Sequence, residues 1–286
     1  GWGRVNFGAE DGAAYLLQVE APSADSNVDG LRTYIQPVNY NILTNGAVAA
    51  GTSVNFDYEQ NITGYDDKLT YLSPILSGFQ LGFSYTPDVG DADDNMAGVR
   101  TDDVQNAFGS AYEGAVRYEG EFENVGVTLG AGFTQRDLEA RRISGAVDFT
   151  DDRQAWNVGV DFDFGPFGLG AAYVEDNNGE AERVAAGNTG TRDDEETWVV
   201  GADYTVGQFK LGASYYNSEN SIVNGTTFQG LETDRYTGGV VYTYGPGMTF
   251  RGSVSYIEHE RTTAAFGTTS NDLEATSVLL GTQIKF

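Results

Sequence analysis

The stretch FKLGASY at residues 209–215 occurs five times in related forms, and this repeat decides the fold class. The other copies are FQLGFSY (79–85), VTLGAGF (127–133), FGLGAAY (167–173) and the longer MTFRGSVSY (248–256). In each copy apolar residues alternate with small or polar ones, and this period of two predicts a β-strand. The central glycines are separated by 48, 40, 42 and 40 residues, a spacing that fits one β-hairpin with its loops.

The connections between these strands are of two kinds. Each of the last four copies follows a partner strand, such as TWVVGADYTV before FKLGASY, and a turn of a few residues with almost no charge joins the two. After each copy the chain runs through a long polar stretch, and these stretches hold most of the 42 Asp and Glu residues. They cover approximately residues 86–112, 137–154, 174–196, 217–235 and 257–274. Short turns at one end and long acidic loops at the other predict a barrel with two chemically different ends.

The composition excludes several classes of function. The 286 residues include 38 Gly, 16 Phe and 17 Tyr but no Cys, which favours an all-β protein and excludes disulfides and thiolate chemistry. A net charge of −26 argues against nucleic acid as a partner, because the two would repel each other. No run of 18 apolar residues occurs, so no helical membrane span is expected. The strands of a transmembrane barrel alternate and need no such run.

A soluble β-propeller or sandwich is the main alternative to a membrane barrel, since its strands can also repeat at about 40 residues. A propeller blade contains four strands, whereas each repeat here has two strands of about ten residues, the length that spans a membrane. Each copy also ends in an aromatic residue, as an interfacial girdle requires. We predict this girdle at Tyr85, Phe133, Tyr173, Tyr215 and Tyr256. The sequence therefore favours an antiparallel transmembrane β-barrel.

Twelve strands are expected along the chain. They cover approximately residues 1–8, 67–73, 78–86, 113–123, 126–136, 154–164, 167–175, 196–206, 208–217, 234–244, 247–258 and 273–286. In the last strand, Val278, Leu280 and Ile284 share one face with Thr282 as the polar exception. An open sheet edge in hydrocarbon would leave backbone groups unpaired. Twelve strands must therefore close as a small barrel or form part of a larger one.

The hairpin repeat, the terminal Phe286 and the opening GWGRVNFGAEDGAAYLL resemble the general porins of Gram-negative outer membranes, particularly the alphaproteobacterial type. The resemblance covers essentially the whole chain and implies a single porin domain over residues 1–286. It implies that residues 1–8 match the fifth strand of a 16-stranded barrel and that the family's first four strands are absent here. It also implies that residues 9–60 form the loop that folds into the barrel, while residues 67–286 supply eleven strands. We favour the larger barrel, because such a loop would plug a narrower bore.

The same resemblance implies the location and the partners of the protein. It places the chain in the bacterial outer membrane, in contact with lipid and lipopolysaccharide, as a homotrimer. The barrel-assembly machinery would recognise Phe286. We expect the trimer interface to include residues 1–8 and the last strand, where a neighbouring subunit would cover Thr282.

Charged residues on the polar faces of the strands are candidates for the pore lining. We expect the following to point into the lumen: Arg4, Lys68, Arg117, Glu119, Asp161, Lys210 and Arg251. The loop acids Glu10, Asp11, Glu20, Asp25 and Asp29 resemble those that such porins set opposite basic residues at the constriction. Opposed charges create a transverse field that filters ions. The alternative for any single residue is a solvated side chain without a role.

These features together predict a non-enzymatic diffusion channel for small hydrophilic solutes and ions, cation-selective because of its negative charge. An adhesin that acts through its acidic loops is the first alternative. Inward glycines such as Gly130, Gly170 and Gly212 argue against it, because they are expected to leave the bore open. An outer-membrane hydrolase is less favoured, since the only histidine, His259, is expected to be a solvated loop residue. No cofactor is expected beyond weakly bound divalent cations at the acidic loops.

Overall fold

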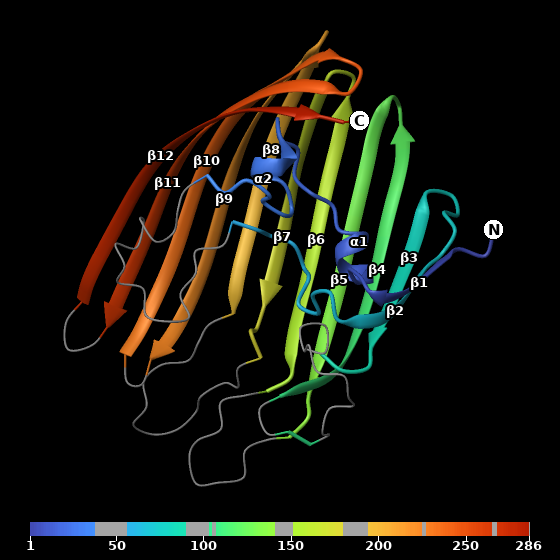
Figure 1. Ribbon diagram of the computed structural model, residues 1–286, viewed down its shortest axis with the longest axis vertical. Helices are drawn as coiled ribbons and strands as arrows, with labels where there is room; N and C mark the ends of the chain where they lie inside the picture. Colours follow the sequence, from blue (N-terminus) through green and yellow to red (C-terminus); the bar gives the residue numbers. More distant parts are fainter. Residues whose placement is uncertain are drawn as a thin grey trace.

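The computed structural model describes residues 1–37, 56–89, 103–104, 107–140, 151–179, 194–224, 227–264 and 268–285. These residues form twelve strands in one antiparallel sheet, whose spatial order follows the chain from β1 to β12 (Figure 1). The strands are β1 (Arg4–Ala9), β2 (Asp67–Leu72), β3 (Phe79–Thr86), β4 (Phe108–Phe122), β5 (Val125–Leu138), β6 (Arg153–Phe164), β7 (Phe167–Asp176), β8 (Glu195–Val206), β9 (Phe209–Asn224), β10 (Thr227–Gly245), β11 (Met248–Ala264) and β12 (Thr268–Ile284). The predicted all-β, antiparallel architecture is confirmed.

The two edges of the sheet are open in the described part of the chain. There, β1 pairs only with β2, and β12 pairs only with β11. Membership of a 16-stranded barrel, and the assignment of residues 1–286 to one barrel domain, stay predictions.

Alternation along the strands gives the sheet an apolar outer face and a polar inner face. In β6, Trp156 and Val158 are 37% and 44% exposed on the outer face, whereas Ala155 and Asn157 are buried on the inner face. In β12, Leu280 is 86% exposed. Lipid is the medium in which so exposed an apolar face is stable. None of the helices in the described ranges is long and apolar enough to cross a membrane.

The strands near the C-terminus are longer than predicted. β9 continues to Asn224 and β10 begins at Thr227, so the expected loop at 217–235 is largely strand. β11 continues to Ala264 and β12 begins at Thr268, and the same correction applies to residues 257–274. The pairing uses backbone groups and does not need an apolar face. These strands have 16 to 19 residues, more than are needed to cross the hydrocarbon layer. Their ends therefore lack the apolar alternation used for the prediction, although they still pair with the neighbouring strands.

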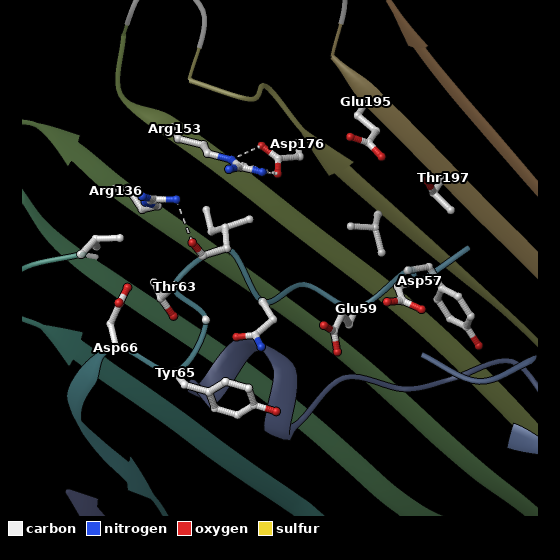
Figure 2. A pocket seen from close by; sticks show the side chains of 16 residues that line it. Asp57, Glu59, Thr63, Tyr65, Asp66, Arg136, Arg153, Asp176, Glu195 and Thr197 are labelled. Carbon is white, nitrogen blue, oxygen red and sulfur yellow. Dashed lines mark hydrogen bonds and ion pairs between the residues drawn. The ribbon is translucent and has the colours of Figure 1, made fainter. Parts of the chain in front are cut away.

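The chain between β1 and β2 crosses the inner face of the sheet. Its described parts, residues 10–37 and 56–66, are called the inner segment below. It contains two short helices, α1 (Ala13–Leu16) and α2 (Ser26–Asp29), which lie in front of the strands in Figure 1. Figure 2 shows the returning residues 57–66 crossing the same face. The inner segment therefore occupies space that the curved sheet would otherwise enclose.

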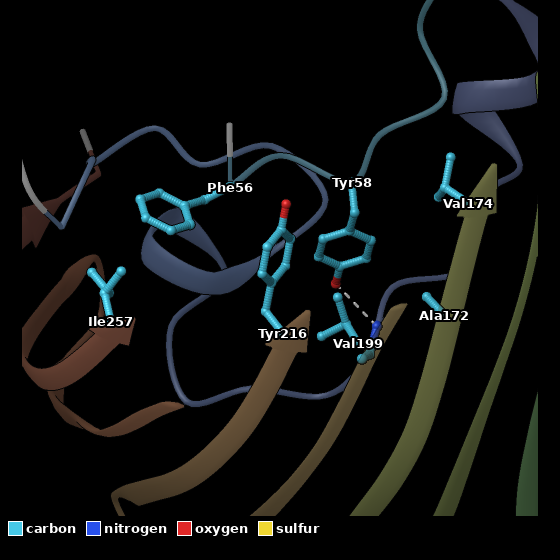
Figure 3. Packing of buried hydrophobic residues seen from close by; sticks show 8 residues of the cluster. Phe56, Tyr58, Ala172, Val174, Val199, Tyr216 and Ile257 are labelled. Carbon is cyan, nitrogen blue, oxygen red and sulfur yellow. Dashed lines mark hydrogen bonds between the residues drawn. The ribbon is translucent and has the colours of Figure 1, made fainter. Parts of the chain in front are cut away.

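The inner face of the twelve-stranded sheet is called the wall below. A cluster of buried apolar side chains lies between the inner segment and the wall (Figure 3). Phe56 and Tyr58 of the inner segment join Tyr216 of β9 and Ile257 of β11 in this cluster. The rings of Phe56 and Tyr216 meet edge to face with their centres 6.0 Å apart. Full burial of one large apolar side chain contributes about 1.5–3 kcal/mol, so this cluster holds the segment firmly against the wall.

Candidate functional site

Glycines on the inner face of the wall allow the inner segment to lie directly against the strands. These glycines, each within 4 Å of the segment at the position a Cβ would take, are Gly82, Gly130, Gly132, Gly159, Gly170, Gly201, Gly212 and Gly239. A Cβ at Gly201 would overlap the carbonyl oxygen of Pro22, and one at Gly212 would overlap the amide nitrogen of Ala24. The interpretation that inward glycines leave the bore open was therefore wrong. Their missing side chains make room for residues 13–24.

Polar contacts fix the first turn of α1 to the wall. The amide of Ala13 donates to Ser84 Oγ of β3 at 2.8 Å, and the amide of Ala14 donates to Glu113 Oε2 of β4 at 3.0 Å. The first amides of a helix have no partner within the helix, so these wall oxygens satisfy them. Residues 10–37 are the outgoing leg of the inner segment and residues 56–66 its returning leg. Thr63 of the returning leg donates to Glu113 Oε1 at 2.6 Å. The buried Glu113 thus holds both legs of the inner segment.

The two legs also bind each other and the middle strands. Gln18 donates from Nε2 to the Tyr58 carbonyl at 2.8 Å and accepts from the Gln60 amide at 2.8 Å. Gln60 Nε2 donates to Thr134 Oγ1 of β5 at 2.8 Å and to the Ala155 carbonyl of β6 at 2.9 Å. Because every one of these groups is buried, breaking any of them would leave an unsatisfied polar atom.

An arginine clamp holds α2. Arg235 of β10 forms an ion pair with Asp29, which also accepts a hydrogen bond from Ser214 of β9. Arg235 is 0% exposed and Asp29 3% exposed. The guanidinium lies 5.0 Å from the ring centre of Phe56 and 5.1 Å from that of Tyr216. Burial raises the pKa of Asp29, and the charge of Arg235 and the hydroxyl of Ser214 oppose that rise.

A second arginine holds the start of α2. Arg251 of β11 forms an ion pair with Asp25 and donates to Gln283 of β12. Asp25 also accepts from the amide of Asn27 at 3.1 Å and so caps the helix. Asp25 and Asp29 were expected to face basic residues across the lumen. They contact their arginines directly instead, so these two pairs hold the segment and leave no gap between opposed charges.

The acid Asp11 lies in a cluster around Arg32 within the inner segment. Arg32 forms ion pairs with Asp11 at 3.1 Å and Glu59 at 2.5 Å, and it donates to the hydroxyl of Tyr65 at 2.7 Å. Its guanidinium lies 4.6 Å from the ring centre of Tyr15. Burial raises the pKa of Glu59, and the hydrogen bond from Arg32 opposes that rise. The cluster ties the outgoing leg to the returning leg.

The remaining expected loop acids lie in different surroundings. Glu10 accepts from Asn6 at 2.8 Å, and its carbonyl accepts from Lys68 Nζ at 2.7 Å. Glu20 is exposed on the inner side. The surrounding protein removes part of its solvent and so raises the pKa of Glu20 above 4.5, and the amide of Leu31 opposes the rise. Among the expected loop acids, Glu20 is the one that faces open space.

Most of the expected wall cations are engaged. Lys68 also donates to the Gly64 carbonyl at 2.6 Å. Arg117 pairs with Glu119 at 2.7 Å and reaches the Gln18 carbonyl at 3.2 Å. Lys210 pairs with Asp203 at 3.1 Å.

Two expected wall residues differ from this pattern. Arg4 is exposed on β1. Asp161 of β6 keeps a buried Oδ1 that has no hydrogen-bond partner among the described residues.

The predicted girdle residues lie in a row on neighbouring strands. Tyr85 lies 5.2 Å from Tyr112, and Tyr215 lies 4.8 Å from both Trp198 and Tyr236, ring centre to ring centre. Tyr173 lies 5.0 Å from Trp156, and Phe133 and Tyr256 are 44% and 36% exposed on the outer face. Their role as a membrane girdle stays a prediction. The predicted assembly signal, Phe286, lies outside the described residues.

Several contacts of the inner face were missed at the level of the sequence. Arg235, Glu113 and Arg136 point inward from strands that were expected, and Arg153 points inward one position before the expected strand 154–164. Arg136 falls two positions after Thr134 and six after Gly130, so the period of two already placed it on the inner face. Strand alternation would have found these residues, but their partners in the inner segment could not be read from it.

The lone histidine does not behave as expected. His259 lies in β11, is 5% exposed, and its Nδ1 is 2.9 Å from Thr233 Oγ1 of β10. The expectation of a solvated loop residue was wrong because β10 and β11 extend past the predicted ends. In the described part of the chain, no group of three or more His, Asp or Glu residues is arranged to hold a metal ion.

A family model described as Gram-negative porin matches residues 1–262. The chain belongs to the Gram-negative porin family. Its β-barrel sheet is therefore one of the bacterial outer membrane, and the predicted family resemblance is confirmed.

Two proteins of known structure share the fold of this chain. The anion-selective porin from Comamonas acidovorans is 16% identical with a TM-score of 0.58, over 100% of this chain and 75% of that one. The outer-membrane protein OmpT of Vibrio cholerae is 15% identical with a TM-score of 0.53, over 99% and 76%. At these identities the likeness shows the fold alone.

A curated relative is also found in another bacterium. An uncharacterized protein of Rickettsia typhi is 24% identical over 226 residues, which is 60% of this chain and 50% of that protein. The match therefore spans half the length of the curated relative.

Proposed function

We propose that this porin-family chain forms an outer-membrane diffusion channel for small hydrophilic solutes and ions. The observation that carries the proposal is the inner segment, which crosses the polar face of the sheet and is held there by Glu113, Arg235 and Arg251. A segment fixed inside a polar bore restricts the passage without relying on a moving part. Family and fold point to a non-enzymatic channel rather than a hydrolase.

We also propose that the channel prefers cations. Four cations of the wall are neutralised, since Arg117, Arg235, Arg251 and Lys210 each pair with a carboxylate. The net charge is −26, so acidic groups remain in excess. The Comamonas porin is called anion-selective, but at 16% identity its selectivity does not transfer to this chain.

Reversal potentials in planar bilayers test both proposals. Under a dilute KCl gradient we expect steady ohmic conductance and a potential of the sign for cation preference, and this preference should fade near 1 M salt, where the Debye length falls to about 3 Å. An absence of conductance would remove the channel. Conductance with anion preference would remove only the selectivity.

The wider assembly is part of the same proposal. β1 and β2 have six residues each, fewer than the roughly 9–11 that span a membrane, so protein rather than lipid is expected to cover this side. A homotrimer with 16-stranded barrels, inserted by the barrel-assembly machinery through Phe286 and bordered by lipopolysaccharide, would provide that cover. Crosslinking between subunits through Thr282→Cys, which lies on the outer face of β12, tests the interface. A monodisperse monomer in mild detergent, with that cysteine labelled by a lipid-phase probe, would contradict it.

A further inference from the structure

A cavity of about 540 Å³ lies between the wall and the returning leg of the inner segment. Figure 2 shows Arg136 on the side of the wall and Glu59 and Tyr65 on the returning leg. The volume is in the range of small-molecule sites. Most of the described residues that line the cavity have polar side chains, and such side chains are costly to cover with an apolar molecule. A ligand of this cavity must therefore offer many hydrogen bonds.

The charges of the lining argue against a simple ion as the ligand. Among the described residues, five acids and two arginines line the cavity, so an anion would be repelled overall. A cation would have to compete with arginines that are already in place. Arg153 pairs with Asp176 and Arg32 pairs with Glu59, each at 2.5 Å. A neutral polar molecule meets neither obstacle.

Arg136 supplies hydrogen-bond donors on the side of the wall. Its Nη1 donates to the carbonyl of Ile62 at 2.9 Å, and its guanidinium lies 4.5 Å from the ring centre of Phe108. Within the part of the chain that the structure describes, this is its only hydrogen bond, although a guanidinium can donate several. Donors therefore remain for the oxygen atoms of a ligand.

Arg32 fixes an acceptor and an aromatic ring on the side of the inner segment. Its Nε donates to Oε2 of Glu59 at 2.5 Å, and its Nη1 donates to the hydroxyl of Tyr65 at 2.7 Å. The other carboxylate oxygen of Glu59 accepts no hydrogen bond from the described residues, and Tyr65 is 54% exposed. This side of the cavity thus combines a hydrogen-bond acceptor with an exposed ring.

The carbonyl of Ile62 sets the distance between the two sides. Arg136 is bound to this carbonyl, and Glu59 precedes Ile62 by three residues, so the backbone separates them by at most about 10 Å. One or two sugar rings cover this span. A hydroxyl group both donates and accepts, so it suits Arg136 and Glu59 alike. The apolar face of a sugar ring can also lie on an aromatic ring such as that of Tyr65.

We propose that the cavity binds a neutral mono- or disaccharide, with hydroxyl groups at Arg136 and Glu59 and one face of a ring on Tyr65. Arg32 acts as a positioning residue, because it holds both Glu59 and Tyr65 in place. The inference rests on the proposed channel in that the site would hold sugars on their way through the bore.

Glucose and glucuronate separate a sugar site from an anion site, because they differ only in the carboxylate at carbon 6. Ligand-observed NMR titrations of the folded full chain in detergent measure the dissociation constant of each, without requiring conductance. We expect glucose to bind more tightly than glucuronate, because the acids of the lining repel the carboxylate. Tighter binding of glucuronate would overturn the proposal.

Substitutions test the individual contacts. Tyr65→Ala and Arg136→Gln should each weaken the binding of glucose about tenfold, whereas Tyr65→Phe keeps the ring and should retain most of the affinity. Tyr34→Ala is the matched control, since Tyr34 is an exposed tyrosine of the same segment that does not line the cavity. It should leave the dissociation constant unchanged. An equal loss from Tyr34→Ala, or unchanged binding in Arg136→Gln, would overturn the site.

The same titrations keep the site separate from the proposed channel. Glucose binding that depends on Arg136 and Tyr65 in a protein without bilayer conductance would sustain the site and remove the channel. Steady conductance in a protein that does not bind glucose would remove the site and leave the channel.

Discussion

The inner segment is held to the wall in two different ways at its two ends. Along residues 17–24 the contact is mainly steric, because wall glycines such as Gly201 let the backbone approach. Around α2 the contact is electrostatic, because Asp25 and Asp29 meet Arg251 and Arg235. Close approach at the glycines does not depend on salt or pH, whereas the ion pairs around α2 depend on charges being present. The comparison shows that one loop can combine close backbone approach with ion pairing. A substitution can weaken either attachment without changing the other.

The largest effect is expected from Arg235→Met, which removes the ion pair between the wall and Asp29 of α2. The replacement would leave Asp29 charged and buried without its partner, at a cost of about 3–5 kcal/mol in the free energy of unfolding. Urea unfolding in lipid vesicles measures this cost. Because protonation neutralises the unpaired carboxyl, the cost should shrink as the pH is lowered. Arg4→Met, at an exposed site, is the control and should stay within about 0.5 kcal/mol of the parent.

An equal loss from both variants would mean that Arg235 and Asp29 do not form a buried pair. If the loss of unfolding free energy in Arg235→Met does not become smaller at low pH, the lost contacts with the rings of Phe56 and Tyr216 would explain it instead.

Gly201→Ala, which disturbs the close contact between the wall and residue 22, should lower the stability by a smaller amount. The new methyl group would meet the Pro22 carbonyl, and forced repacking of this kind costs about 1–3 kcal/mol. We expect lower stability in the same unfolding assay and a less steady single-channel current. Gly238→Ala is the matched control, because nothing lies within 4 Å of its Cβ position. Identical behaviour of the two variants would show that residues 13–24 do not lie on the wall.

How far the sequence predicts this architecture differs between the wall and the inner segment. Strand alternation predicted the twelve strands, because each strand pairs with its neighbour in the chain. It could not predict the clamp, because Asp29 lies 185 residues from Ser214 and 206 from Arg235. The same alternation put Gly212 on the inner face but carried no information on what would fill the space above it. The features that the sequence did not predict are thus contacts between segments far apart in the chain.

The smallest effect concerns Glu20, which belongs to neither attachment and faces the interior. Its raised pKa means that the folded protein binds this proton more readily than a free glutamate does. The carboxylate should therefore lose its charge as the pH falls, starting above 4.5. Cation preference should weaken over that range, by about twofold for one charge acting at about 10 Å in water. Reversal potentials of Glu20→Gln that fall with pH as steeply as those of the parent would exclude Glu20 as the source.

The central claim is that the inner segment rests on the wall in the folded barrel, and a disulfide tests it most directly. The chain has no cysteine, and the Cβ position of Gly239 lies 3.0 Å from Cβ of Ala24. Disulfides span roughly 3.5–4.5 Å between Cβ atoms, so a small outward shift of residue 24 brings the pair into range. Ala24→Cys with Gly239→Cys should crosslink in folded protein and leave the bilayer conductance as in the parent. Ala24→Cys with Gly238→Cys, on the opposite face, should not crosslink. Failure of the first pair to close, or a large fall in conductance when it does, would contradict the account.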